Sequence, residues 1–391
     1  MLKSLKSLPA TIWLLGLVSF FNDSASELVY PLVPLYLASV LMAGPKALGL
    51  IEGVAEATGS LLKLFAGVMA DRLHSTKYWV VGGYSLAALG RPLLALAGSW
   101  PVVLALRFAD RVGKGLRTSP RDALLALSVE PERRGLAFGL HRAMDNAGAV
   151  VGPLLAAWLL ARGMPIRDIL GWTLIPGLIT VALALSIREP RREAVHDRQA
   201  FSWTLQGFSP EFKRYLLVLA LFTLGNSSNM FLLLRARDMG LPEAQVPLLW
   251  ALVAATATLF STPLSALSDR IGRTRLIVVG WGVYGVFYLL LGLNGHTLWL
   301  LWPLFAFYGL FMAATEGAEK ALVADLAPKE RIGAAYGWFN LTAGAMLLPA
   351  SLLFGWLWQS LSPETAFGFG AGCALLAAVL LRFWVPAGSQ R

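Results

Sequence analysis

The sequence is poor in the residues from which most catalytic and metal-binding sites are built. Among 391 residues there is one cysteine, Cys373, and there are four histidines, which are scattered along the chain. One cysteine excludes an internal disulfide, and isolated histidines lack the close spacing of metal ligands. The sequence also offers no nucleophile–base pair and no phosphate-binding loop. We therefore expect no metal centre, no cofactor and no enzymatic activity.

Charged residues are also scarce, at 14% of the chain, whereas hydrophobic residues make up 57%. A composition this apolar excludes an ordinary soluble protein. A helix needs about 20 apolar residues to cross a bilayer, and runs of that length recur about twelve times. They lie near residues 11–40, 46–70, 78–98, 101–126, 135–161, 168–187, 214–237, 244–267, 276–294, 297–326, 333–359 and 365–385. The sequence thus predicts an all-α polytopic membrane protein with twelve transmembrane helices.

The longest polar segment divides these helices into two groups of six. It extends from Ile187 to Arg214 and is charged and proline-bearing. We expect a six-helix bundle over residues 1–187, a linker over 188–213 and a second bundle over 214–391. Lys and Arg gather in the connections on the side of this linker, so the positive-inside rule makes that side, with both termini, cytoplasmic. Because this asymmetry accounts for the excess of 33 Lys and Arg over 23 Asp and Glu, we expect no nucleic-acid partner.

The two halves of the sequence repeat one another. An Asp-Arg pair at positions 71 and 72 recurs at positions 269 and 270, an offset of 198 (269 − 71). The stretch 122–139 matches the stretch 320–337 at the same offset (320 − 122). Two separate places with one offset indicate two pseudo-symmetric bundles that arose by duplication.

The segment Gly67-Val-Met-Ala-Asp71-Arg72 resembles the Gly-x-x-x-Asp-Arg loop signature of the major facilitator superfamily of transporters, and residues 265–273 resemble its weaker second copy. The resemblance covers the whole chain. It implies two six-helix bundles around a central cavity, which alternate access to the two sides of the membrane by rocking, and it implies that the loop is a gate. The expected gate residues are Asp71, Arg72, Asp269 and Arg270, together with Arg117, Arg121 and Asp122 as an ion-pair latch.

Two further stretches resemble signatures of proton-coupled exporters in that family. Gly148-Ala-Val-Val-Gly152-Pro153 is similar to the antiporter signature Gly-x-x-x-Gly-Pro, in which small residues let two helices approach closely and proline favours a bend. The residues that begin at Arg107 are similar to Arg-x-x-Gln-Gly-x-Gly, although an acid and a base replace the usual Gln and Gly. The resemblance implies a role for Arg107 in proton coupling.

The stretch from Arg107 to Asp122 holds seven charged residues between apolar runs. On an ideal helix their side chains fall within an arc of roughly 140°. A charged side chain costs at least about 2.5 kcal/mol at the centre of a lone transmembrane helix, so these groups must face one another or a wet cavity. Other predicted helices carry similar polar faces. We expect proton or cation coupling at Asp23, Glu27, Asp145 and His141. We expect substrate contacts at Asn22, Arg107, Asp110, Arg111, Lys114, Asn146, Asn226, Asn229, Glu316 and Glu319.

These observations favour secondary active transport, namely proton-coupled efflux of a small organic compound. The expected partners are the lipid bilayer, the transported molecule and protons, and the expected form is a monomer in the bacterial inner membrane. Three alternatives stay open. The first is export of an anionic metabolite or metal chelate, which the basic residues between Arg107 and Asp122 favour. The second is export of a divalent cation, for which Asn22, Asp23 and Glu27 offer hard oxygen ligands. The third is a membrane protein that does not transport.

Overall fold

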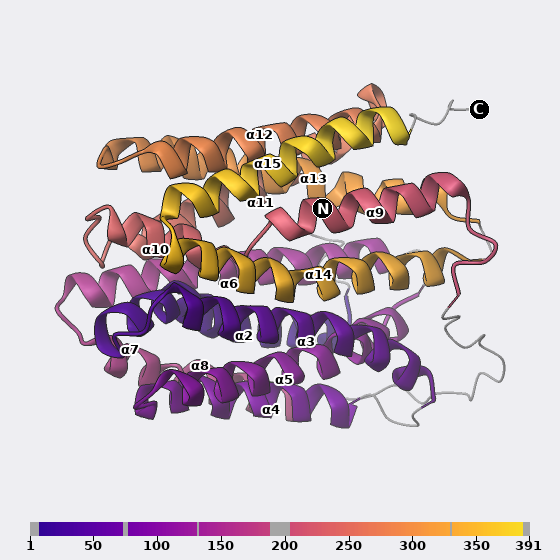
Figure 1. The fold of residues 1–391 in the computed structure, drawn as a ribbon. Helices are drawn as coiled ribbons and strands as arrows, with labels where there is room; N and C mark the ends of the chain where they lie inside the picture. Colours follow the sequence, from indigo (N-terminus) through magenta and orange to yellow (C-terminus); the bar gives the residue numbers. More distant parts are fainter. Residues whose placement is uncertain (1–7, 73–76, 131–132, 188–203, 329–330, 386–391) are drawn as a thin grey trace. The chain divides into compact units, whose positions relative to one another are not determined.

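The computed structural model describes residues 8–72, 77–130, 133–187, 204–328 and 331–385, and these ranges form helices joined by short connections (Figure 1). The chain divides into two compact units. Unit 1 comprises Met1–Leu41 and Thr58–Ala200, and unit 2 comprises Met42–Ala57 and Phe201–Arg391. The second helix, α3 (Pro45–Arg72), is therefore divided between the two units.

Each segment that the sequence predicts to span the membrane is mostly helical where the structure describes it. Besides its part of α3, unit 1 contains α2 (Ala10–Leu35), η1 (Tyr36–Val40), α4 (Lys77–Leu93), η2 (Leu94–Leu96), α5 (Trp100–Leu127), α6 (Arg134–Ala161), α7 (Ile166–Trp172) and α8 (Leu174–Ser186). Unit 2 contains α9 (Pro210–Gly225), α10 (Met230–Asp238), α11 (Val246–Ile271), α12 (Arg273–Leu293), η4 (Leu298–Leu300), α13 (Leu301–Leu326), α14 (Ile332–Ser360) and α15 (Pro363–Trp384).

Eight helical segments within the described residues are long and apolar enough to cross a membrane. They are Lys77–Leu96, Leu136–Ala161, Ile166–Ser186, Pro210–Asp238, Arg273–Leu293, Leu298–Leu326, Ala334–Ser360 and Pro363–Trp384. Helices α2 and α5 are not among them, although both have more than 20 residues. The reason is their composition, because each carries several of the charged and polar residues that the sequence assigns to a site.

The predicted seventh span is broken in the structure. Helix α9 ends at Gly225 and α10 begins at Met230, and the backbone of Asn226 is not helical (φ −95°, ψ 77°). The segment between them reads Asn-Ser-Ser-Asn. Such side chains compete with the helix for backbone hydrogen bonds, and the Ser228 hydroxyl accepts a hydrogen bond from the backbone N–H of Met230 at 3.3 Å. Local side-chain chemistry therefore interrupts a run that hydropathy alone predicts as continuous.

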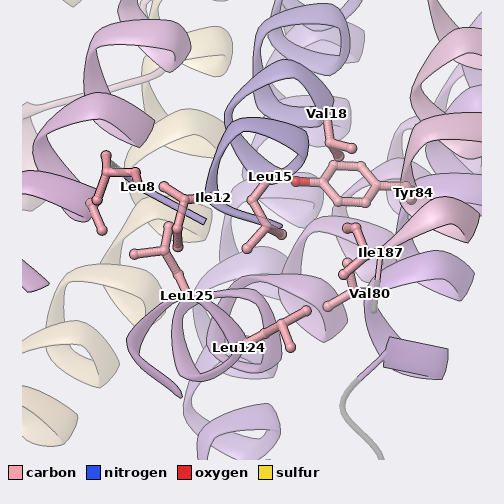
Figure 2. Packing of buried hydrophobic residues seen from close by; sticks show 11 residues of the cluster. Leu8, Ile12, Leu15, Val18, Val80, Tyr84, Leu124, Leu125 and Ile187 are labelled. Carbon is pink, nitrogen blue, oxygen red and sulfur yellow. The ribbon is translucent and has the colours of Figure 1, made fainter. Parts of the chain in front are cut away.

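One end of unit 1 is held by a compact apolar cluster (Figure 2). Figure 2 shows the ring of Tyr84 on α4 among Leu15 and Val18 of α2 and Ile187, which follows α8. The fully buried residues of this cluster on α5 are Leu124 and Leu125. The cluster packs the ends of α2, α4 and α5 against one another and so fixes the register of the polar residues farther along these helices.

The interior of unit 2 is rich in aromatic side chains. Helices α12 and α15 lie side by side (Figure 1). The ring of Phe222 on α9 stacks on Trp281 of α12 with centroids 4.3 Å apart, and Tyr284 and Tyr288 stack at 4.2 Å. These rings are almost completely buried, and large buried rings contribute much of the packing energy of a core. The aromatic residues of this region therefore stabilise unit 2.

Candidate functional site

Helices α2 and α6 approach each other closely at two glycines of α6. A Cβ atom added to Gly148 would lie 2.6 Å from the carbonyl oxygen of Phe20, and one added to Gly152 would lie 2.5 Å from that of Ser24. Real Cβ atoms do not occur at such distances, so these positions require glycine. The backbone of Glu27 also lies next to Gly152. The close approach brings polar side chains of the two helices into contact.

Two predicted coupling residues meet across this interface. The carboxyl groups of Asp23 on α2 and Asp145 on α6 lie within hydrogen-bonding range of each other. The Ser19 hydroxyl donates to Asp145 Oδ1 at 2.6 Å, and the Asn22 amide donates to Asp23 Oδ1 at 2.7 Å. A neighbouring arginine, Arg142, lies 3.8 Å from Asp145 Oδ2 but is largely exposed. The structure therefore brings together two acids that are more than 120 residues apart in the sequence.

A second cluster surrounds Asp110 on α5. Its carboxylate lies 3.0 Å from Arg91 Nε, 3.5 Å from Arg111 Nη1 and 3.9 Å from Arg107 Nη1. All four residues are only 3% to 4% exposed. Buried charges are tolerated only when they are paired and hydrogen-bonded. Asp110 therefore serves as a common counter-charge for three guanidinium groups.

Hydrogen bonds join the two clusters. Arg91 Nη1 donates to both the backbone carbonyl and the side-chain oxygen of Asn22, at 3.0 Å each. Because Asn22 also donates to Asp23, a continuous network runs from Asp145 through Asp23, Asn22 and Arg91 to Asp110. The network connects α2, α4, α5 and α6 within unit 1. A change of charge at one end can therefore alter the hydrogen bonds at the other end.

Arg91 and Ser19 belong to this network although the sequence analysis did not assign them to a site. Arg91 is a lone base in an otherwise apolar run, which is a signal that it needs a buried partner. Ser19 carries no comparable signal, because serine is common on transmembrane helices. Its role becomes visible only when α6 is packed against α2.

The other predicted residues of unit 1 have varied surroundings. His141 is buried on α6, one turn before Asp145, and its Nε2 has no hydrogen-bond partner among the described residues. Lys114 and Asn146 are half-buried, on α5 and α6. Arg121 pairs with its neighbour Asp122 at 2.8 Å. The predicted gate residues Asp71, Arg72, Asp269 and Arg270 lie at the ends of α3 and α11, and their side chains are outside the described residues.

The predicted residues of unit 2 form separate contacts. On α13, Glu319 accepts a hydrogen bond from Trp281 Nε1 at 2.9 Å, whereas Glu316 pairs with Lys320 on the exposed side of the same helix at 3.0 Å. Asn229 accepts a hydrogen bond from Tyr308 at 2.5 Å. Asn226 ends α9 as its C-cap residue. These residues therefore do not gather into one network in the way that those of unit 1 do.

The break between α9 and α10 holds one polar contact that the sequence analysis did not predict. The carboxylate of Glu52 on α3 is completely buried in unit 2, and Ser228 donates a hydrogen bond to it at 3.4 Å. The described residues contain no group of three or more His, Cys, Asp or Glu side chains that could hold a metal ion.

Comparison with known proteins places the chain among transporters. A family model described as the Major Facilitator Superfamily matches residues 12–235 and 215–391. An uncharacterized MFS-type transporter of Methanocaldococcus jannaschii is 33% identical over 387 residues, which cover 97% of this chain and 96% of the relative. The multidrug resistance protein MdtH of Salmonella arizonae is 25% identical over 329 residues, which cover 80% of this chain and 77% of MdtH. The crystal structure of nucleoside transporter NupG matches with a TM-score of 0.78 at 14% identity, covering 95% and 98% of the two chains, and this likeness concerns the fold alone.

Proposed function

Because the chain belongs to the Major Facilitator Superfamily, we propose that it exports a small organic compound across the bacterial inner membrane in exchange for protons. The family identifies it as a multi-pass membrane transporter and not as an enzyme. In this proposal, residues 1–187 and 214–391 provide two six-helix bundles joined by the linker 188–213, both termini are cytoplasmic, and a monomer alternates access by rocking.

The observation that carries the proton-coupling proposal is the carboxyl pair of Asp23 and Asp145. Two carboxyl groups at hydrogen-bonding range are held together when they share one proton and repel each other when both are ionised. A proton bound between them therefore favours the close approach of α2 and α6, and its release favours separation. Such a pair is a two-state element whose equilibrium depends on proton binding.

The hydrogen-bond network provides a route from this pair to the residues proposed to contact substrate. Loss of the shared proton makes Asp23 a stronger acceptor for the Asn22 amide N–H, and this polarises the Asn22 side chain and strengthens the hydrogen bond that its oxygen accepts from Arg91. Arg91 in turn holds the carboxylate around which Arg107 and Arg111 are arranged. In this proposal a proton and a substrate influence each other through one chain of contacts.

Two observations support export as the direction of transport. The chain is similar to the multidrug resistance protein MdtH, and Gly148, Gly152 and Pro153 match the antiporter signature of proton-coupled exporters. In the structure both glycines lie at the tightest part of the α2–α6 interface. Close packing at this point lets the carboxyl pair respond to small movements of the two helices.

The test is transport into proteoliposomes under an imposed pH gradient, with a panel of cationic, zwitterionic, anionic and neutral organic compounds. We expect flux of at least one compound to follow the gradient and to lose that dependence in Asp23→Asn and Asp145→Asn. The matched control is Asp168→Asn, because Asp168 is an exposed acid on α7 outside the network. Flux that ignores the gradient, or that keeps its gradient dependence in both network variants, would refute proton coupling at this pair.

A further inference from the structure

The side chain of Arg117 on α5 differs from the other arginines around it. Arg91, Arg107 and Arg111 share the carboxylate of Asp110, and Arg121 pairs with Asp122. Arg117 is equally buried, at 4% exposed, but it makes no ion pair and donates no side-chain hydrogen bond within the described part of the chain. Its guanidinium carbon instead lies 4.5 Å from the centre of the Tyr84 ring.

This arrangement leaves two adjacent polar groups without partners. Arg117 Nη1 and the Tyr84 hydroxyl are both buried, and neither has a hydrogen-bond partner among the described residues. A guanidinium group stays charged in proteins, so it cannot relieve its burial by losing a proton. The aromatic face compensates part of the charge, but it does not replace the oxygen acceptors that the guanidinium N–H groups need. A buried intramembrane charge without a hydrogen-bonded counter-charge indicates a binding site for a ligand.

The position of Arg117 is fixed by the packing of α4 against α5. A Cβ atom added to Gly83 would lie 2.5 Å from the carbonyl oxygen of Gly113 and 2.7 Å from Arg117 Cβ. The ring of Tyr84 is held in the apolar cluster of unit 1 (Figure 2). The Tyr84 ring and the backbone of Arg117 are therefore held in place before any ligand arrives, which lowers the entropic cost of binding.

The charges that act on Arg117 at longer range are mixed. Asp23 and Asp110 attract it without pairing with it, and Arg91 repels it. The two acids are already engaged by the hydrogen bonds and ion pairs of the network. A further negative charge is thus accommodated at Arg117 better than at any other guanidinium of the cluster, since those already share a carboxylate.

We propose that Arg117 and Tyr84 bind an oxyanion group, a carboxylate or a phosphate, of the exported compound. One oxygen would accept from Arg117 Nη1 and another from the Tyr84 hydroxyl, in the planar geometry that suits guanidinium recognition of such groups. This inference rests on the proposed export function and narrows its substrate to organic anions and zwitterions. It also assigns Arg117 to substrate binding rather than to the gate latch that the sequence favours.

The experiment measures binding to the full-length protein in detergent at constant ionic strength and pH. Thermal unfolding and calorimetric titration are followed with benzoate and phenyl phosphate, with benzamide as the neutral analogue, and with chloride and inorganic phosphate as free anions. The variants are Arg117→Gln, Arg117→Lys and Tyr84→Phe. The matched control is Arg162→Gln, because Arg162 also stacks on an aromatic ring, 4.3 Å from Trp158, but is exposed.

We expect the organic anions, but not benzamide, to stabilise the wild-type protein and Arg162→Gln equally. Removing a hydrogen bond to a charged group lowers affinity by about tenfold or more. Arg117→Gln should therefore bind the organic anions at least about tenfold more weakly than the wild type. Arg117→Lys should keep part of the affinity, because lysine keeps the positive charge. It should lose the rest, because lysine lacks the planar pair of guanidinium N–H groups. Tyr84→Phe should weaken binding without lowering the stability of the free protein.

Equal binding by wild type and Arg117→Gln, or no effect of either organic anion on the wild type, would overturn the proposal. If Arg117→Gln does not fold, unchanged binding by both Arg117→Lys and Tyr84→Phe would overturn it as well. Stabilisation by chloride or inorganic phosphate that equals and competes with that by benzoate would identify a counter-ion site and refute the substrate role. No pH gradient is applied, so the result is independent of whether transport is proton-coupled.

Discussion

Replacing Asp110 by Asn should destabilise the protein strongly, because this residue is the shared counter-charge of three buried arginines. The substitution keeps the size of the side chain and removes only its charge. In the wild-type protein the Asp110 carboxylate lies between 3.0 Å and 3.9 Å from the nearest nitrogens of Arg91, Arg107 and Arg111. Removing one partner of a buried ion pair costs about 3 to 5 kcal/mol, and here three cations lose their common partner and repel one another.

The expected shift of the unfolding midpoint can be worked out from the chain length. The entropy of unfolding is about 2.1 cal/mol/K per residue. If all 391 residues unfold together, each kcal/mol of lost stability lowers the unfolding midpoint by about 1.2 °C. A loss of 3 to 5 kcal/mol then lowers the midpoint by about 4 to 6 °C. The shift should change little with salt, because buried charges are poorly screened.

Thermal unfolding in detergent, followed by intrinsic tryptophan fluorescence, measures this shift. Arg91→Gln should cost less than Asp110→Asn, since Asp110 keeps two arginines. The control for stability is Asp122→Asn, whose side chain is 45% exposed and pairs with the adjacent Arg121; exposed pairs contribute about 0 to 1 kcal/mol. An Asp110→Asn midpoint within about 1 °C of the wild type would show that the arginines do not depend on this carboxylate.

Two further predictions concern packing and a helix end. Gly152→Ala should lower the free energy of unfolding by about 1 to 3 kcal/mol, because the added methyl group clashes with α2. Gly139→Ala is the control and should be nearly neutral, because no atom lies within 4 Å of its added Cβ. Equal midpoints of the two variants in thermal unfolding would contradict the close packing. Arg235→Ala should destabilise unit 2, because Arg235 Nη2 donates to the carbonyls of Gly292 and Asn294 at the C-terminus of α12, at 3.1 Å each. Arg237→Ala is its matched control, since this arginine is more exposed and pairs with the acids Asp238 and Glu243. A midpoint no lower in Arg235→Ala than in Arg237→Ala would reject the capping role.

The helices of this protein could be predicted from sequence because hydropathy and periodicity are local properties. A run of about 20 apolar residues becomes a helix in a membrane wherever it occurs, since the backbone must satisfy its own hydrogen bonds there. The cost of intramembrane charges likewise predicts that Asp110 and the nearby arginines need partners. The broken seventh segment departs from this rule, because the Ser228 hydroxyl bonds to the backbone of Met230, an interaction that average hydropathy does not register.

The identity of the partners was decided only by the tertiary structure. Helical periodicity places Asp23 and Asp145 on polar faces, but it does not determine which faces meet. The glycines of α6 set that contact by letting α2 approach, so Ser19 and Asp145 are hydrogen-bonded although 126 positions separate them. Similarly, Arg117 belongs to the same charged face as its neighbours in sequence, and only the packing of α4 places it over an aromatic ring instead of a carboxylate. Sequence determined which residues needed a partner, and the packing of helices far apart in the chain decided which of them received one.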